Sequence, residues 1–417
     1  MKNVFLIGNG FDSHHMLPTK YFDFMCVTEY LKHSLLVFPI TIGKVFSECK
    51  TNTNISRCYE AHKEVFDSKT IESKHITNLL QLVENNIWFN YFSKTLNRDL
   101  GWIDFEKEIS TVLCTLDRII TLDESTVDLP QHELLPPFIL SHFRFFVDIN
   151  NGAEIFPGED FDIKSQYLRE YPHNSGILVA DKKEIFKTLF EQLLNFSKAL
   201  NIYFDCFVEN TFDLLHKDSY TNRHRIELVN KADTVISFNY TSTLEKLYFN
   251  KTAHHIHGTV QAGKIVLGVN PSASDDIGTE DTSLIKFKKY YQREVYGTDT
   301  DYFNWYRENV SAHSEYRLVV IGHSLDETDK DIISDMFLNA KEIYVTYYDD
   351  DCKDSYIANI VKMFGKNGFD TFRRDQRMQF IKLSNISTLE ERFKPVEIDW
   401  HVSGNISSEI GEKIIPI

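Results

Sequence analysis

Short, unbroken apolar runs that end in glycine or a small polar residue occur at the start of the chain and again in its second half. The first covers residues 4–7, and residues 318–321 repeat the pattern, while residues 234–238 form a short β-branched run. A run of this length without polar interruptions is typical of a strand buried on both faces of a parallel sheet. Residues 343–347 and 377–383 predict two more strands, and we expect the last one at an edge of the sheet.

Apolar residues at helical spacing dominate the chain between the first two of these runs. Thr19 can cap a helix that continues to about Tyr30, and residues 185–200 repeat apolar positions with the period of a helix. Helices are also expected from near Thr328 and over residues 353–364. Strands that alternate with helices in this way predict an α/β fold with a doubly wound, mostly parallel, Rossmann-like sheet.

The same pattern divides the chain into a split core and an insertion. Residues 1–30 and 226–350 are expected to form a discontinuous α/β nucleotide-binding core. A large, mainly helical insertion over residues 31–225 would follow the first β-α unit, and residues 351–417 would extend the core at its C-terminal end.

Two local patterns predict finer detail within the core. Residues 254–257 and 264–267 flank a Gln-Ala-Gly turn, which predicts a hairpin or two neighbouring strands. Ser242 and Glu245 have the spacing of a capping box at the start of a helix.

Composition and charge limit the possible classes of protein. The 417 residues are 42% hydrophobic and carry a formal net charge of −16, so we expect no general binding to nucleic acid, although backbone N–H groups can still bind one nucleotide. The six cysteines form no Cys-x-x-Cys pair, which disfavours a disulfide framework and a structural zinc site. The sequence has no signal-peptide pattern and no apolar stretch long enough to cross a bilayer, so we expect a cytoplasmic protein that does not act at a membrane.

The turn after the first strand carries a pattern of small residues. Gly8, Gly10 and Ser13 occupy the three small positions of a GxGxxG fingerprint, with serine in the last place. Such a turn lets the backbone approach a pyrophosphate at the N-terminus of a helix. Glycine pairs also end ordinary strands, and Asp12 could cap the helix instead of contacting a ribose. The candidate nucleotide-binding residues here are Gly8, Asn9, Gly10, Phe11 and Asp12.

Two candidate catalytic residues follow later strands. Asn239 comes directly after residues 234–238, where an amide can orient a water or a ribose hydroxyl, or can cap the next helix. His257 precedes Gly258 at the expected end of a strand and could act as a general base, because the ordinary pKa of histidine lies near neutrality. A histidine that only satisfies hydrogen bonds at a strand end is the alternative. His255 would share its face, but no third ligand follows and we expect no metal.

The strand over residues 318–321 is followed by a second glycine turn. Gly322 and Ser324 are candidate contacts to a phosphate or ribose, whereas Asp326 and Asp329 are expected to cap a helix. If all these segments serve one nucleotide, Gly10, Asn239, His257 and Ser324 should border one pocket at the carboxyl edge of the sheet.

Residues 102–106, with the pattern W-x-D-x-E, open another amphipathic helix. Asp104 and Glu106 suit its first turn, where the helix dipole favours carboxylates, and Trp102 is expected in the core.

Several of these segments together resemble the AbiH abortive phage-infection family. They are LIGNGFD followed by LPTKYFDF, W-x-D-x-E, SFNYTSTLE, HIHG and IGHSLDETD, in that order between Leu6 and Asp329. The resemblance implies a role in bacterial defence against phage.

A more distant resemblance is to sirtuin-like NAD-consuming domains. Their glycine turn, catalytic asparagine, H-G histidine and late G-x-S correspond to the segments at Gly8, Asn239, His257 and Gly322. Thr241 replaces an aspartate of the sirtuin motif, and the four zinc cysteines of the deacylases are absent. The resemblance therefore implies a sirtuin-like sheet and hydrolysis of NAD rather than deacylation.

We accordingly expect an NAD glycohydrolase with Asn239 and His257 as catalytic residues and with no cofactor beyond its nucleotide substrate. The trigger would be phage-derived or a partner protein, and the chain could form a homo-oligomer. One alternative is a nucleotide-binding sensor without catalysis. Another is a nuclease or nucleotide-processing enzyme with metal ions at Asp349, Asp350 and Asp351, although these residues also suit a solvated loop.

Overall fold

The computed structural model describes residues 1–96, 104–124, 147–148, 162–163, 167–170, 178–269, 282–311 and 315–393. Its centre is a six-stranded parallel sheet in the order β12-β11-β10-β1-β8-β9. The strands are β1 (Lys2–Ile7), β8 (Thr234–Ser237), β9 (Ala253–His255), β10 (Tyr316–Ile321), β11 (Glu342–Tyr347) and β12 (Met378–Lys382). The predicted α/β class is confirmed, and so is the position of the last strand at an edge.

The strand order determines where a ligand site can form. Counted along the chain, the strands lie in the order sixth, fifth, fourth, first, second, third, which is the order of a doubly wound Rossmann-like sheet. Ile7 pairs with Ser237 on one side and with Ile321 on the other, so these three strands end together. We call this side of the sheet the carboxyl edge. The topological switch point lies there, between β1 and β10.

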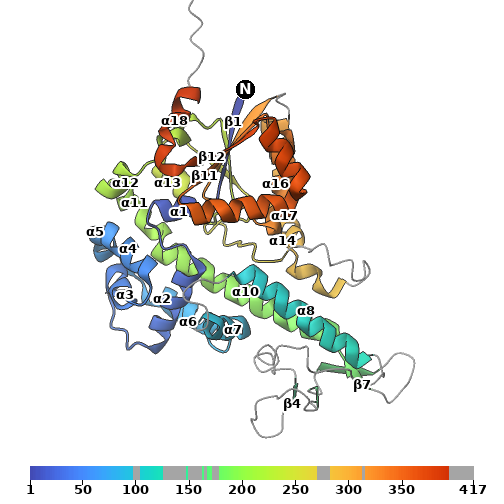
Figure 1. Cartoon of the computed structure of the whole chain (residues 1–417). Coiled ribbons are helices and arrows are strands. Elements are labelled where there is room, and N and C mark those ends of the chain that lie inside the picture. Colours follow the sequence, from blue (N-terminus) through green and yellow to red (C-terminus); the bar gives the residue numbers. More distant parts are fainter. Residues whose placement is uncertain are drawn as a thin grey trace, which may run out of the picture.

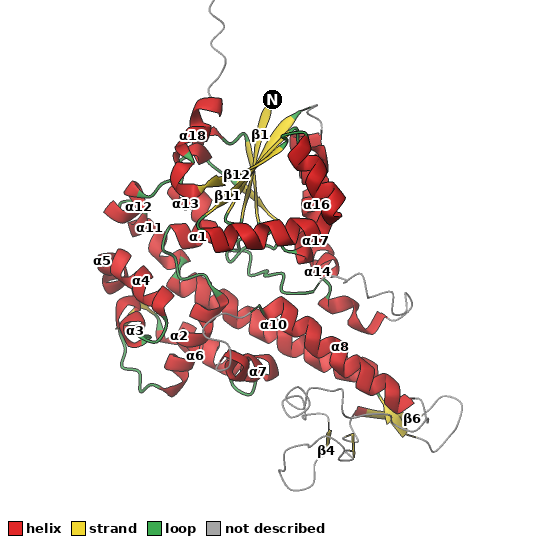
Figure 2. Ribbon diagram, viewed as in Figure 1, coloured by secondary structure: helices red, strands yellow, loops and turns green. Residues whose placement is uncertain are grey.

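Side chains of each strand alternate between two cores, because successive residues of a strand point to opposite faces. Phe5 and Ile7 pack with the helical region that follows β1, whereas Val4 and Leu6 pack with the helices next to β10 and β11. Both faces are thus covered (Figure 2). The helices outside the insertion are α1 (Asn9–His14), α13 (Thr243–Leu247), α14 (Lys289–Tyr296), α15 (Thr298–Tyr306), α16 (Lys330–Asn339), α17 (Asp350–Arg374) and α18 (Ser387–Glu390).

A mainly helical region separates α1 from β8, and in Figure 1 it lies below the sheet, next to α1 and the carboxyl edge. The hydroxyl of Tyr203 donates to the carbonyl of Pro18 (2.8 Å), and this hydrogen bond links the helical region to the segment after β1. Its helices are α2 (Tyr21–His33), α3 (Ile42–Glu48), α4 (Thr53–Ala61), α5 (Lys63–Ser68), α6 (Ser73–Val83), α7 (Ile87–Leu96), α8 (Phe105–Glu124), α10 (Lys182–Phe207), α11 (Phe212–Leu215) and α12 (Ser219–Arg223). Its short strands are β2 (Ile40–Thr41), β3 (Thr70–Ile71), β4 (Val147–Asp148), β5 (Asp162–Ile163), β6 (Leu168–Glu170) and β7 (Leu178–Ala180). The domain boundaries themselves stay a prediction, and Trp102 lies outside the described residues.

Three local predictions are wrong. Residues 264–267 form no strand, because β9 pairs in parallel with β8 instead of forming a hairpin. Thr19 is not the cap of α2, since its hydroxyl donates to Asn9 Oδ1 (2.6 Å) and the cap position is Lys20. Ser242 does precede α13, but its side chain makes no capping hydrogen bond.

Candidate active site at the carboxyl edge

The turns after β1 and β10 touch each other through glycines. The N–H of Gly10 donates to the carbonyl of Gly322 (2.7 Å), and Gly322 has a φ of +67°. A Cβ atom on Gly10 would lie 2.6 Å from Gly322 Cα, and one on Gly322 would lie 2.3 Å from the nitrogen of Phe11. Close approach of the two backbones therefore accounts for both glycines without a ligand. Their predicted role in binding a pyrophosphate stays a prediction.

The other residues of the first turn differ in exposure. Gly8 is buried, Asn9 and Gly10 are exposed, and Phe11 is fully buried. The ring of Phe11 packs against His15 and Tyr248, so only its backbone is left to contact a nucleotide.

A buried hydrogen-bond network joins the first turn to the segment after β8. Asn239 Nδ2 donates to the carbonyl of Gly8 (3.0 Å) and to Asp12 Oδ1 (3.1 Å). The hydroxyl of Thr241 donates to the other oxygen of Asp12 (2.5 Å). Asn239 thus links two strand ends instead of capping the next helix. Its Oδ1 accepts no hydrogen bond from any described residue and is left for a water or a ligand.

Burial changes the acid–base behaviour of Asp12. Desolvation of the carboxylate raises its pKa to about 7, although hydrogen bonds from Thr241 and Thr243 oppose the rise. The negative charge of Glu209 adds to it. A carboxyl group with a pKa near neutrality can give or take a proton under physiological conditions, which is typical of catalytic sites.

A second buried network surrounds His257, which follows β9. Its Nε2 lies 3.1 Å from Asp329 Oδ1, although the N–H is not aligned for a hydrogen bond. Lys289 Nζ lies 2.8 Å from the same oxygen. All three side chains are at least nine-tenths buried. Asp329 was expected to cap a helix, and the structure instead places its carboxylate between a histidine and a lysine.

The helical insertion contributes to this network. Glu106 of α8 forms an ion pair with Lys289 (2.7 Å), so the predicted first-turn carboxylate points toward the sheet. Asp104, by contrast, accepts from the N–H of Lys107 and caps α8. The Glu106–Lys289 pair joins the insertion to the carboxyl edge.

Each pKa in this network follows from burial and from the neighbouring charges. Burial, reinforced by the positive charge of Lys289, lowers the pKa of His257 to about 4. Burial alone would raise the pKa of Asp329, but Lys289 and His257 outweigh it and hold that pKa well below its usual range. Burial raises the pKa of Glu106, and Lys289 opposes the rise. At neutral pH His257 is therefore uncharged and faces an ionised Asp329.

The turn after β10 adds one buried and one exposed residue. His323 is buried and its Nε2 lies 3.5 Å from Asp329 Oδ2, while its Nδ1 accepts from the N–H of Leu325 (2.9 Å). Ser324 is exposed, and its carbonyl accepts from Asn359. Its hydroxyl is thus open to solvent at the switch point.

The structure brings the predicted catalytic residues to the same edge and adds partners that the sequence did not identify. Lys289, Asp329 and Glu106 come from three distant segments, and no local pattern marks Lys289. Lys289 is the first residue of the short helix α14, and only its burial distinguishes it from an ordinary surface lysine.

No group of three or more histidine, cysteine or acidic side chains in the described part of the chain has the geometry of a metal site. His255 contacts the carbonyl of Asn239 (2.9 Å) and Glu245 (3.3 Å), which accounts for its two ring nitrogens. Asp349 caps α17 by accepting from the N–H of Cys352 (2.9 Å), and Asp350 and Asp351 are exposed in its first turn.

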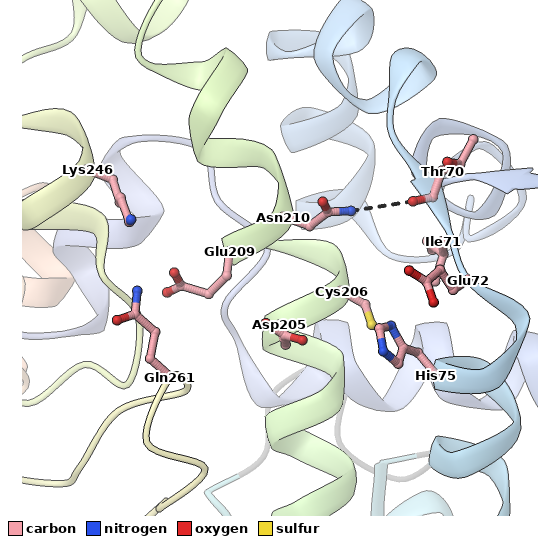
Figure 3. Close-up of a pocket in the computed structure, with 10 residues that line it drawn as sticks. All are labelled: Thr70, Ile71, Glu72, His75, Asp205, Cys206, Glu209, Asn210, Lys246 and Gln261. Atoms are coloured by element: carbon pink, nitrogen blue, oxygen red, sulfur yellow. Dashed lines mark hydrogen bonds between the residues drawn. The ribbon is translucent and has the colours of Figure 1, made fainter.

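A cavity of about 330 Å³ lies near this edge, where the insertion meets the core (Figure 3). Lys246 and Gln261 of the core face Glu209, and Thr70 and His75 line the opposite side. None of the predicted site residues lines it. The pocket expected between Gly10, Asn239, His257 and Ser324 stays a prediction.

The comparisons with known proteins bear on the family of the chain. Among the described residues, no helix is long and apolar enough to cross a membrane. Searches of curated proteins and of solved structures gave no match. The family described as Bacteriophage abortive infection AbiH matches residues 4–349, which is most of the chain. The chain therefore belongs to the AbiH family of bacteriophage abortive-infection proteins.

Proposed function

We propose that this AbiH protein acts in abortive infection by hydrolysing NAD to nicotinamide and ADP-ribose at the carboxyl edge of its sheet. The observation that carries the proposal is two buried pairs, Asn239 with Asp12 and His257 with Asp329, which follow four adjacent parallel strands around the switch point. Ligands of open α/β sheets bind at this position. Buried groups with shifted pKa values support chemistry there rather than binding alone.

His257 suits the role of the base. It is uncharged at neutral pH, because burial lowers its pKa to about 4. With Nε2 facing Asp329, Nδ1 is the nitrogen left to take a proton from water. The ionised carboxylate of Asp329 would stabilise the imidazolium that forms, as the aspartate of a catalytic triad does.

Asn239 and Asp12 suit the positioning of water and ribose. The amide of Asn239 is fixed by Gly8 and Asp12, so its free oxygen has a defined direction. Water adds to the ribose carbon as the bond to nicotinamide breaks, and the proton of the water passes to His257. Nicotinamide leaves from a cationic ring and needs no acid, so one base and good positioning suffice.

A nucleotide-binding sensor without catalysis is the second candidate. The exposed hydroxyl of Ser324 and the tight Gly10–Gly322 contact would serve binding as well as catalysis.

Incubation of the purified full-length chain with NAD tests the proposal. We expect nicotinamide and ADP-ribose to appear in equal amounts, measured by chromatography. If NAD is not consumed but raises the melting temperature, the sensor replaces the hydrolase. If NAD is neither consumed nor bound, both are wrong.

A further inference from the structure

A second cavity, of about 400 Å³, lies outside the carboxyl-edge site. Its walls come from α4, from α12 and from Met16, which follows α1. These elements lie on the same side of the molecule in Figure 1. The volume falls within the range of small-molecule sites, roughly 300–1,000 Å³. We call this cavity the arginine groove.

The groove carries positive charge on an acidic protein. Arg57 and Arg223 line it and are exposed, although the whole chain has a net charge of −16. Neither guanidinium forms an ion pair with another residue in the part of the chain that the structure describes, and Arg223 donates only to the carbonyl of Ser219 (3.2 Å). Most N–H groups of both arginines are therefore available to an anion, and their planar geometry suits a phosphate.

The walls of the groove are fixed from beneath by a buried histidine. His62 lies between α4 and α5 with its side chain fully buried. Its Nε2 donates to the carbonyl of His15 (2.8 Å), and its Nδ1 contacts Asp218 Oδ2 (3.0 Å). Asp218 in turn caps α12 through the N–H of Thr221 (3.0 Å). One buried side chain thus holds all three walls, and a site with fixed walls loses less entropy on binding.

The remaining lining residues favour a nucleotide over a bare anion. Tyr220 is held in place by stacking on His224, with 3.9 Å between ring centroids. Together with Met16 it offers apolar surface to a base. Glu60 would repel a phosphate beside it, but it can accept hydrogen bonds from ribose hydroxyls or a base amino group.

We propose that the arginine groove binds a nucleotide, with the phosphate at Arg57 and Arg223 and the base beside Tyr220 and Met16. Two sources share this chemistry: a free mononucleotide and the 5′-phosphorylated end of a nucleic-acid strand. The proposal is independent of NAD hydrolysis, because no residue of the groove belongs to the carboxyl-edge site.

Calorimetric titration of the full-length chain with adenosine 5′-monophosphate, inorganic phosphate and adenosine tests the proposal. We expect the nucleotide to bind at least about ten-fold more tightly than either fragment, since only it engages both halves of the groove. Arg57→Ala/Arg223→Ala should weaken its binding by about ten-fold or more. The matched control is Arg373→Ala/Arg374→Ala, which removes two exposed arginines at the end of α17 and should leave the affinity unchanged.

Two further arms separate this site from the proposed reaction site and identify the source of the ligand. His257→Gln should bind the mononucleotide like the wild type, and Arg57→Ala/Arg223→Ala should keep any NAD hydrolysis. A 5′-phosphorylated oligothymidylate that displaces the mononucleotide points to strand ends, and one that does not points to free nucleotides. Unchanged affinity in Arg57→Ala/Arg223→Ala, or no binding of the mononucleotide by the wild type, would overturn the proposal.

Discussion

Asp12 shows how burial alters a residue that the sequence marks only as a helix cap or a ribose contact. Asp12 is 1% exposed, and desolvation of its carboxyl group raises the pKa to about 7. In the unfolded chain it would titrate near 3.8. The difference corresponds to roughly 4 kcal/mol.

The first prediction follows from this difference. Below about pH 4 the carboxyl is neutral in both states, whereas between about pH 4 and 7 only the unfolded chain ionises, so ionisation of Asp12 favours unfolding as the pH rises. Asp12→Asn removes this pH-dependent destabilisation. We expect the melting temperature of Asp12→Asn, relative to the wild type, to rise over that range. A constant difference would show that Asp12 ionises normally in the folded protein.

The sequence predicts the positions of single site residues better than their partners. Asn239 and His257 could be placed at the carboxyl edge because each follows a recognisable strand. The contact of His257 with Asp329 depends on how the turn after β10 packs, which no local pattern reports. Asp329 therefore looked like a helix cap.

At the scale of elements, the contact between the turns after β1 and β10 fixes the switch point. Gly322 has a φ of +67° and touches the backbone of Phe11 and Gly10. Gly263 has a φ of +63°, yet a Cβ on it would meet nothing within 4 Å. The two glycines thus share a backbone conformation and differ in packing.

The second prediction compares alanine at these two glycines. Gly263→Ala should cost about 1 kcal/mol, the strain of a left-handed alanine. Gly322→Ala should cost at least about 2 kcal/mol more, because the methyl group must push two turns apart. Denaturant unfolding measures both. Equal losses would mean that the turns separate easily.

The third prediction concerns the ion pairs of Lys289. Lys289→Met leaves Glu106 and Asp329 buried without their cation and should cost about 3–5 kcal/mol. Lys341→Met, which breaks an exposed pair with Glu315, should cost less than about 1 kcal/mol. A similar loss of stability in both variants would show that Lys289 is solvated.

Helices and strands were predicted where the local spacing of apolar residues defines them. They were missed where the structure depends on which strands pair. The short apolar runs predicted the buried strands, since the apolar residues of such a run must face two cores. The hairpin prediction failed because His254 pairs in parallel with Ile236, a long-range choice that the Gln-Ala-Gly turn does not reveal. Glu245 likewise accepts from the N–H of Ala253 instead of completing a capping box.

At the scale of the whole molecule, a buried polar junction links the insertion to the sheet. Glu106 from α8 reaches Lys289, and the hydroxyls of Tyr21 and Tyr240 lie 3.3 Å apart across the same junction. Helices of the insertion thus cover the edge at which Asn239 and His257 lie. This cover limits the access of bulk water, which strengthens electrostatic interactions at the edge.

The most direct test of this account is the rate of nicotinamide release from NAD by the wild type, His257→Gln and His254→Gln. His254 is a matched control, because burial lowers its pKa to about 4 as well. Its ring stacks on Trp305, which packs on the face of the sheet away from the helical insertion. We predict a fall of about 100-fold or more for His257→Gln and a change of less than about two-fold for His254→Gln. Equal rates for the wild type and a folded His257→Gln, or no release by the wild type, would contradict the account.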